Sequence, residues 1–408
     1  MLVPFAGCGE DSTEDRVVGS VPGDARAYLH LDRGSEDWEK ARDALAKLPA
    51  IESTVLSLLS GQIEVPGDGQ AGVALLPGRD EPVVLTPDDP PARRNLAITP
   101  VYEQLIARLP MQRLATLYLS HSATEPLRLI DRTIAAAGAA ADVDGDRMKI
   151  TARVRHLGGS GPCDATGGDE LLELGDPDAA FYLELPSIAC GLRSLARRFE
   201  GVNEAVKRFG RAAQRQGGVS VDDELMPLLD HRGALIASPG KGAPVLTFIL
   251  DDVDEEQALD ILARLQPALV HLLGVEELGQ VPTFGATDVA GVTAATAQLA
   301  PGLELSYAAF DDRLVVSTAV QGIAAVRRGE GLPGEDGFDA VLSDRPDELS
   351  ALLFLDLNQL LTLGEQAGLA EDPRYLAVRD DLQKLRAAGA VVSREEEFTT
   401  AELTFQIP

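Results

Sequence analysis

The stretch Asp178-Ala179-Ala180-Phe181-Tyr182-Leu183-Glu184-Leu185 has the pattern of a short strand and is followed by a helical segment. Its order of an aromatic residue, a leucine and a polar residue recurs in residues 24–31, 117–120 and 353–357. Repeated strands that alternate with helical segments predict an α+β fold. We expect two diverged copies of one antiparallel-sheet unit, with helices packed on one face of each sheet.

The same strand pattern predicts which side chains face the core. Alternation places Leu29 and Leu183 inward, together with Ala27 and Phe181. On this interpretation a Leu183→Asp substitution would bury an unpaired charge and cost several kcal/mol. A Glu184→Ala substitution would then be nearly neutral.

The chain of 408 residues is long for one domain and natural for two. Residues 1–20 are interpreted as the remnant of a lipid-attachment signal and an acidic tether. Residues 21–157 are expected to form the first α+β unit, and residues 173–408 a second, longer one. The glycine-rich residues 158–172 are interpreted as the linker between them. Four strands should correspond in pairs: those bearing Tyr28 and Tyr182, and those bearing Tyr118 and Phe354.

Composition and charge exclude several classes of protein. The apolar fraction of 45% and the mean hydropathy of +0.00 are typical of a globular chain rather than a disordered one. The sequence contains no run of about 18 apolar residues, so we expect no internal membrane span. The formal net charge of −29 repels a phosphate backbone, so we expect no nucleic-acid partner.

The amino-terminal residues Phe5-Ala6-Gly7-Cys8 are similar to a bacterial lipobox, and the polar, acidic residues 9–15 fit a tether. No Lys or Arg precedes Cys8 and the apolar segment is short, so we expect the true start upstream of Met1. We predict that Cys8 is lipidated and that the membrane is a partner through this anchor. The predicted location is the outer face of the cytoplasmic membrane. An ordinary frayed terminus with a chance cysteine is the alternative.

The other two cysteines form an even pair if Cys8 is lipidated. Outside the cytoplasm, Cys163 and Cys190 could form a disulfide bond. Its closed loop would restrict the unfolded chain by about 3 kcal/mol. Two buried or free thiols are the alternative. A CxxC motif or a Cys/His cluster would indicate a metal site, and the sequence has neither.

Three polar motifs have structural explanations. Asp142, Asp144 and Asp146 resemble a calcium-binding loop. The glycine stands at the fourth position of this loop rather than the sixth, and the twelfth position is not a glutamate. We therefore predict a hairpin turn. Residues 158–161 match neither a nucleophile elbow nor a phosphate-binding loop. The acidic residues within 251–256 precede a helix and are expected to stabilise the positive end of its dipole.

The five histidines, at positions 30, 121, 156, 231 and 271, show no metal-ligand spacing. We therefore expect no catalytic, cofactor-binding or metal-binding residues, and no cofactor. An enzyme would instead require His30, His121 or His231 to meet a carboxylate in a cleft.

Residues 193–215 form the one basic stretch of this acidic chain. The pattern predicts a helix over residues 187–216, with Glu200 and Glu204 close enough to pair with neighbouring arginines. We favour a solvated, ion-paired face. Contact with anionic lipid headgroups is the alternative.

Several short motifs resemble those of a known family: Val-Pro-Gly-Asp-Ala-Arg-Ala-Tyr-Leu at residues 21–29, Leu48-Pro49, and residues 102–110 followed by Leu-Ala-Thr-Leu-Tyr-Leu at residues 114–119. The chain resembles a bacterial family, defined only as a domain of unknown function, of exported or membrane-attached proteins from high-GC Gram-positive bacteria. The resemblance spans most of residues 21–408. It implies an exported or membrane-attached location and brings no catalytic residues.

These observations favour a lipid-anchored, non-enzymatic binding or scaffolding module of the cell envelope. A carrier of lipid or another apolar ligand between the two halves is one alternative, and an apolar cavity would support it. An envelope hydrolase that uses scattered Asp, Glu and His residues is the other alternative.

Overall fold

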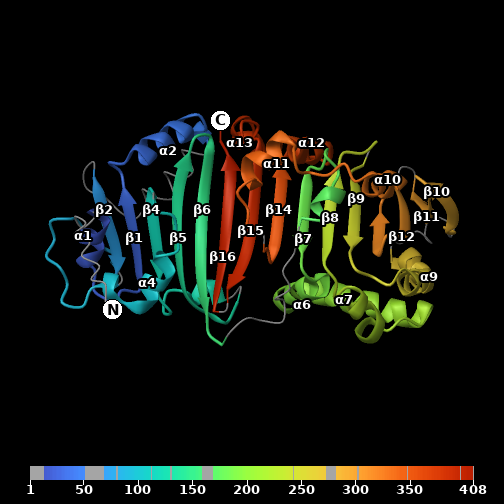
Figure 1. The fold of residues 1–408 in the computed structure, drawn as a ribbon, viewed down its shortest axis with the longest axis horizontal. Coiled ribbons are helices and arrows are strands. Elements are labelled where there is room, and N and C mark those ends of the chain that lie inside the picture. Colours follow the sequence, from blue (N-terminus) through green and yellow to red (C-terminus); the bar gives the residue numbers. More distant parts are fainter. Residues whose placement is uncertain are drawn as a thin grey trace, which may run out of the picture. The chain divides into compact units, whose positions relative to one another are not determined.

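The structure is a computed structural model of a mixed α+β protein with antiparallel strands (Figure 1). It describes residues 13–50, 69–79, 81–111, 113–128, 131–158, 169–241, 243–272, 282–300, 303–346, 348–395 and 397–407. The chain forms two compact units. The first comprises residues 1–159, 395–402 and 407–408, and the second comprises residues 160–394 and 403–406.

The sheet of the first unit is built around β1 (Ala27–Asp32), which pairs with β2 (Gln70–Leu75) and β4 (Ala115–Leu119). Its described strands follow the order β6-β5-β4-β1-β2-β3. The remaining strands are β3 (Val83–Leu85), β5 (Ile134–Asp144) and β6 (Arg147–His156). The helices are α1 (Thr13–Gly19), α2 (Glu36–Ala46), the 3-10 helix η1 (Leu96–Ile98), α4 (Pro100–Ile106) and α5 (Glu125–Arg128).

An aromatic cluster forms the centre of the first unit's core. Tyr28 of β1 stands opposite Tyr118 of β4. Tyr102 of α4 packs edge-on against Tyr118, with ring centroids 5.3 Å apart. Gly138 of β5 permits this close packing, because a Cβ there would lie 3.1 Å from Ile106 Cδ1. Helix α4 therefore covers the face of the sheet that bears the tyrosines.

The sheet of the second unit is built around β7 (Phe181–Leu185), which pairs with β8 (Gly233–Ser238) and β14 (Ala351–Asp356). Its described strands follow the order β10-β11-β12-β13-β9-β8-β7-β14-β15. The other strands are β9 (Val245–Leu250), β10 (Gly285–Val289), β11 (Val292–Ala300), β12 (Leu303–Phe310), β13 (Arg313–Ser317) and β15 (Ala387–Glu395).

The helices of the second unit connect and cover these strands. The α-helices are α6 (Ile188–Arg198), α7 (Glu200–Ala212), α8 (Met226–Leu228), α9 (Glu255–Leu272), α10 (Val320–Arg328), α11 (Asp336–Leu342), α12 (Leu357–Gln366) and α13 (Pro373–Leu382). Short helical segments are η2 (Leu172–Leu174), η3 (Ala213–Gly217), η4 (Val221–Leu225) and η6 (Leu369–Glu371).

The main core of the second unit also contains an aromatic pair. Tyr182 of β7 is fully buried and stands opposite Ile236 of β8 and Phe354 of β14. Phe338 of α11 packs edge-on against Phe354, with ring centroids 5.4 Å apart. Residues of α10 and α11 complete this cluster, so these two helices cover the face of the sheet that bears Tyr182.

The residues that face the core differ from those expected. Tyr28 and Tyr182 are fully buried, whereas Leu29 and Leu183 are half-buried and lie on the opposite faces of their strands. The predicted inward orientation of the two leucines is therefore wrong. The covering helices lie on the side of the aromatic rings, which bury more area than a leucine.

Two of the expected non-core segments contribute to the cores. Residues 13–19 were assigned to the tether, but they form α1, whose Val17 and Val18 are buried in the first unit. Leu171 and Leu172 were assigned to the linker, but both are buried in the second unit. In each case a pair of adjacent apolar side chains outweighs the polar character of the surrounding segment.

The carboxyl-terminal boundary also differs from the prediction, which placed all of residues 173–408 in the second unit. Residues 395–402, which include the first half of β16 (Phe398–Gln406), belong to the first unit. There Lys149 Nζ lies 2.6 Å from Glu402 Oε2. This ion pair joins β16 to β6 in the first unit.

The predicted hairpin turn near residue 145 is confirmed. Strands β5 and β6 pair from Ile134 and His156 up to Asp144 and Arg147. Gly145 in the connection has a φ of 60°, a left-handed conformation that glycine adopts readily.

Candidate functional site

One face of the second unit's sheet is apolar and incompletely covered. The strands β9, β8, β7, β14 and β15 lie side by side (Figure 1). Along each of them, side chains of this face alternate with buried ones. Leu235 and Leu246 are 37% and 44% exposed, and the other members are half-buried. We call this surface the open face; it consists of Phe181, Leu183, Leu185, Leu235, Ala237, Leu246, Phe248, Leu353, Leu355, Ala390 and Val392.

The same side of the sheet is covered farther along. Over β12 and β13, Tyr307 and Leu314 are buried in a cluster with Ile261 and Leu265 of α9. Phe248 packs against this cluster and marks the boundary of the open face. Contiguous apolar surface of this kind is uncommon on soluble proteins and marks sites of interaction.

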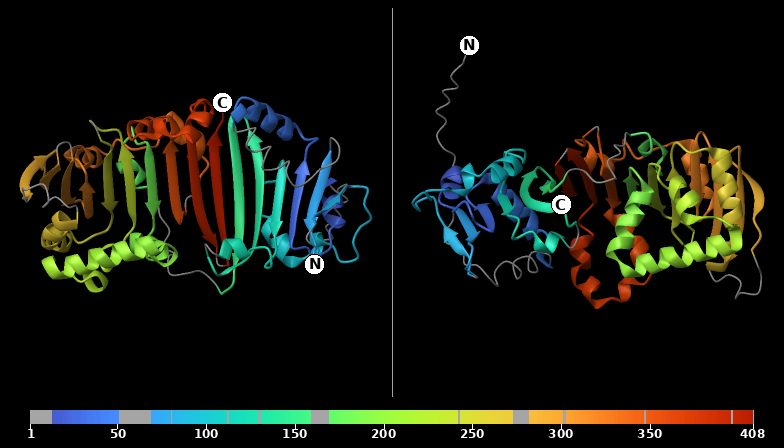
Figure 2. Two further views of the ribbon diagram at one scale, coloured as in Figure 1. Left: turned by 180° about the vertical axis from the view of Figure 1, so that it is seen from behind. Right: turned by 90° about the horizontal axis from the view of Figure 1, so that it is seen from below.

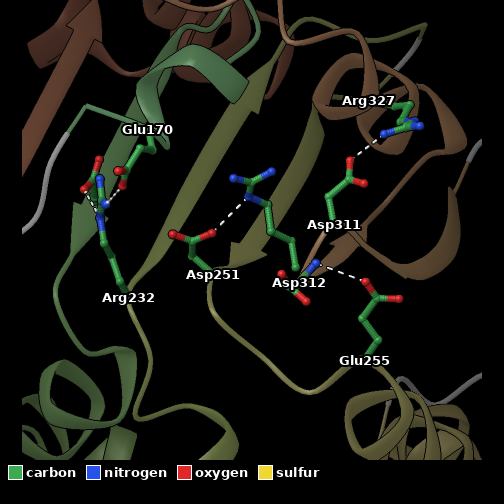
Figure 3. A network of polar contacts seen from close by, with 9 residues as sticks. Glu170, Arg232, Asp251, Glu255, Asp311, Asp312 and Arg327 are labelled. Carbon is green, nitrogen blue, oxygen red and sulfur yellow. Dashed lines mark hydrogen bonds and ion pairs between the residues drawn. The ribbon is translucent and has the colours of Figure 1, made fainter.

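A buried polar network lies on the core side of β7 (Figure 3). Tyr182 Oη donates a hydrogen bond to Glu184 Oε2 at 2.7 Å, and Arg232 Nε donates to Glu184 Oε1 at 2.7 Å. Arg232 Nη1 also donates to Glu170 Oε2 at 2.8 Å. Burial raises the pKa of Glu184 and raises the pKa of Tyr182 well above its usual value. Both carboxylate oxygens of Glu184 are engaged, so the network supports the strand rather than a ligand.

A second group of carboxylates stabilises the β12–β13 turn (Figure 3). Asp311 and Asp312 have φ angles of 53° and 58°, as a two-residue type I′ hairpin requires. Arg327 pairs with Asp311, and the backbone N–H of Asp312 donates to Glu255 Oε1 at 3.0 Å. Glu255 belongs to the acidic segment expected at the start of a helix. These contacts fix a turn and the start of α9.

His156 has a carboxylate neighbour. Its Nδ1 lies 3.7 Å from Asp131 Oδ2 and 2.8 Å from Thr133 Oγ1, and its Nε2 lies 2.9 Å from Thr399 Oγ1. The backbone N–H of His156 also donates to Glu397 O at 2.8 Å. These contacts join a hydroxyl, an imidazole and a carboxylate, as some catalytic sites do. Here, however, they lie beside the backbone hydrogen bond from β6 to the residue that precedes its neighbouring strand β16. We interpret them as a cross-strand hydrogen-bond network.

A cavity of about 210 Å³ lies beside α12 and is lined by Asn358, Leu361, Thr362, Glu365 and Gln383. Hydrogen bonds from Arg379 and Tyr375 hold the pKa of Glu365 at about 2. This carboxylate is therefore ionised and already engaged between α12 and α13.

The predicted cysteine sites fall largely outside the described residues. Cys8 and Cys163 both lie there. Cys190 of α6 is buried and takes part in a disulfide bond. Its pairing with Cys163 stays a prediction.

Within the described residues, no group of three or more His, Cys, Asp or Glu side chains is arranged to hold a metal ion. In the same part of the chain, no helix has the length and apolar character needed to cross a membrane.

Sequence reasoning missed the open face, although a signal was present. In residues 181–185, apolar Phe181, Leu183 and Leu185 alternate with Tyr182 and Glu184. Such a strand offers an apolar side chain on both faces of an antiparallel sheet. Alternation alone placed the leucine face in the core, whereas in the structure the Tyr182 face is buried and the leucine face is open.

Comparisons with known proteins identify no family. No family model matches the chain, and no curated protein sequence matches it. A solved structure titled "Structure of crystal form III of TP0453" is similar over 56% of this chain and 77% of that chain, with 10% identity and a TM-score of 0.26.

Proposed function

We propose that this chain is an extracytoplasmic, lipid-anchored binding module without catalytic activity, and that its open face binds an acyl chain or a similar apolar ligand. The observation that carries the proposal is the row of half-buried and exposed apolar side chains on five adjacent strands, with leucines on four of them. Ligand sites are mostly apolar, and the side chains of this surface are apolar and incompletely covered.

The dimensions of the open face suit an acyl chain. Neighbouring strands are about 4.8 Å apart, so the five strands from β9 to β15 span roughly 19 Å. One leaflet of a bilayer has a hydrocarbon thickness of about 15 Å, half of the usual core. An extended acyl chain can therefore lie across the strands and contact apolar side chains on each of them.

Charge favours such a ligand over a second copy of the chain. Each copy carries a formal net charge of −29, and docking two copies face to face brings like charges within the screening length of about 8 Å, where they repel. The hydrocarbon part of a lipid carries no charge, and its transfer from water to an apolar surface is favourable. We therefore assign the open face to an apolar ligand and not to self-association.

The anchor is the second part of the proposal. It is supported by Phe5-Ala6-Gly7-Cys8 and by the disulfide bond at Cys190, because disulfides persist mainly outside the cytoplasm. We expect Cys8 to carry a diacylglyceryl group when the complete reading frame is expressed in its host. Mass spectrometry of the native amino-terminal peptide checks this. An unmodified Cys8 still preceded by Met1 would contradict it.

A fluorescent fatty acid tests the binding surface. Leu235 and Leu246 are exposed, so a Leu235→Glu/Leu246→Glu variant is expected to fold. Its carboxylates would have to be desolvated against the bound acyl chain, which is unfavourable. We expect the affinity for the probe to fall at least tenfold, or about 1.4 kcal/mol, in a fluorescence titration.

The matched control introduces the same charges elsewhere in the second unit. Leu259 of α9 and Leu376 of α13 are 36% and 53% exposed and lie outside the open face. A Leu259→Glu/Leu376→Glu variant should bind the probe like the parent chain. Equal affinities for the two double variants, or no binding by the parent chain, would refute the assignment of the open face.

We also propose that the two units are diverged copies of one unit. In support, β1 lies between β2 and β4 with Tyr28 opposite Tyr118, and β7 lies between β8 and β14 with Tyr182 opposite Phe354. The next strands outward are β3 and β5 in the first unit, and β9 and β15 in the second. On this proposal β10–β13 are an insertion in the second copy.

A further inference from the structure

Helices α6 and α7 carry a concentration of positive charge in an acidic protein. Residues 193–215 contain seven basic and two acidic side chains, while the whole chain has a net charge of −29. The single helix expected over residues 187–216 is interrupted at Phe199, whose backbone is extended. Figure 2 shows α6 and α7 along the ends of the strands of the second unit.

The basic side chains of α7 point away from the packed side of the helix. Val202, Val206 and Phe209 repeat at helical spacing and are half-buried. Residues 204, 208 and 211 follow the opposite side of α7, residue 215 continues this stripe in η3, and all four are exposed. The three arginines of this stripe, Arg208, Arg211 and Arg215, therefore face solvent.

These arginines are not neutralised within the described part of the chain. There Glu204 pairs with Lys207, at 3.1 Å, and not with an arginine as expected. Arg215 Nε donates to the backbone oxygen of Arg211 at 3.0 Å, and Arg197 Nε donates to that of Arg193 at 3.3 Å. Among the described residues, the exposed arginines of α6, α7 and η3 form no ion pair: Arg193, Arg197, Arg208, Arg211 and Arg215.

Two exposed apolar side chains stand at the junction of the helices. Leu195 near the end of α6 is 47% exposed, and Phe199 between α6 and α7 is 57% exposed. Large apolar side chains next to exposed arginines are typical of protein segments that lie at a lipid interface. They have no favourable partner in a sugar–phosphate backbone.

We propose that α6 and α7 bind the surface of an anionic lipid bilayer, with Arg208 and Arg211 of α7 and Arg215 of η3 on the headgroups. The negative charges elsewhere on the protein do not prevent this, since charges are screened beyond about 8 Å at physiological ionic strength. The headgroup chemistry is that of an anionic phosphodiester. This contact is separate from the open face and does not require a lipidated Cys8.

The test uses the full chain with Cys8→Ser, so that no lipid anchor contributes, and vesicles with or without phosphatidylglycerol in phosphatidylcholine. We expect sedimentation with the anionic vesicles only. Each basic side chain near an anionic surface contributes substantially, so an Arg208→Gln/Arg211→Gln/Arg215→Gln variant should bind about 100-fold more weakly. Adding Phe199→Ser to this triple variant is expected to lower its affinity for the anionic vesicles further.

The matched control removes three exposed arginines elsewhere. Arg42, Arg93 and Arg374 are also exposed, and their replacement by glutamine changes the net charge by the same amount. This control should bind anionic vesicles like the parent chain, and circular dichroism should show both triple variants folded. Equal loss in the two variants, or no vesicle binding by the parent chain, would overturn the proposal. Equal affinity for a duplex DNA of matched phosphate concentration would also overturn it, by assigning the surface to nucleic acid.

Discussion

Replacing Glu184 with alanine is expected to lower the free energy of unfolding by about 3 kcal/mol, because it leaves a buried hydroxyl and a half-buried guanidinium without their shared acceptor. Tyr182 and Arg232 both donate to this carboxylate at 2.7 Å, and Glu184 is 8% exposed. Glu170 still accepts from Arg232, which keeps the loss at the lower end of the usual range. Urea unfolding followed by circular dichroism measures it.

The neighbouring position supplies the control. Leu183 lies on the open face and is half-buried, so Leu183→Asp should cost only about 1 kcal/mol, as for most single substitutions. This order is the reverse of the one that alternation of the sequence alone predicts. A larger loss for Leu183→Asp than for Glu184→Ala would show that the leucine face is the buried one.

Phe338→Ala is expected to destabilise the protein by about 4 kcal/mol, the usual cost of removing a buried aromatic side chain. Phe338 is fully buried, and its ring contacts that of Phe354 on β14. The loss removes both the apolar contacts and the edge-on ring contact that join α11 to the sheet. Thermal and urea unfolding of the variant measure the change.

Phe199→Ala is the matched control, because it makes the same chemical change at a side chain that is 57% exposed. Its effect on unfolding should lie within about 0.5 kcal/mol of zero. Similar losses in the two variants would contradict the assignment of Phe338 to the core and of Phe199 to the surface.

Local sequence patterns predicted many individual strands and turns. Strand patterns on either side of Pro-Gly turns predict that residues 71–76 pair with 82–85 and residues 234–238 with 245–250. These pairs are formed by β2 with β3 and by β8 with β9. In these hairpins the turn chemistry and the strand pattern agree over a short stretch of chain. Such features depend little on distant parts of the fold.

The alanine-rich residues 134–141 show where local preference fails. The sequence pattern of residues 125–137 predicts a helix, and alanine has the highest helix propensity. Instead α5 ends at Arg128, and Ile134 begins β5. A small residue is needed for packing here, because a Cβ at Gly138 would lie 3.1 Å from Ile106 Cδ1 and 3.3 Å from Leu105 Cβ of α4. Packing of α4 against β5 favours a strand over a helix here, and this long-range contact cannot be inferred from the local sequence.

The candidate site was harder to predict than the fold. Alternation identifies two faces of a strand, but it does not say which face a distant helix covers. Helices α10 and α11 follow β7 by more than 130 residues, and they select the Tyr182 face. The open face is what remains, so it could be recognised only once the covering helices were placed.

Photo-crosslinking with a diazirine fatty acid tests the central claim most directly. The probe is bound to the full chain, activated by light, and the modified residues are identified by mass spectrometry of peptides. We predict adducts on β7, β8, β9 and β14, at Leu183, Leu235, Leu246 and Leu353. Adducts confined to α12 and α13, or spread evenly over the exposed leucines of the chain, would contradict the assignment of the open face as the ligand-binding surface.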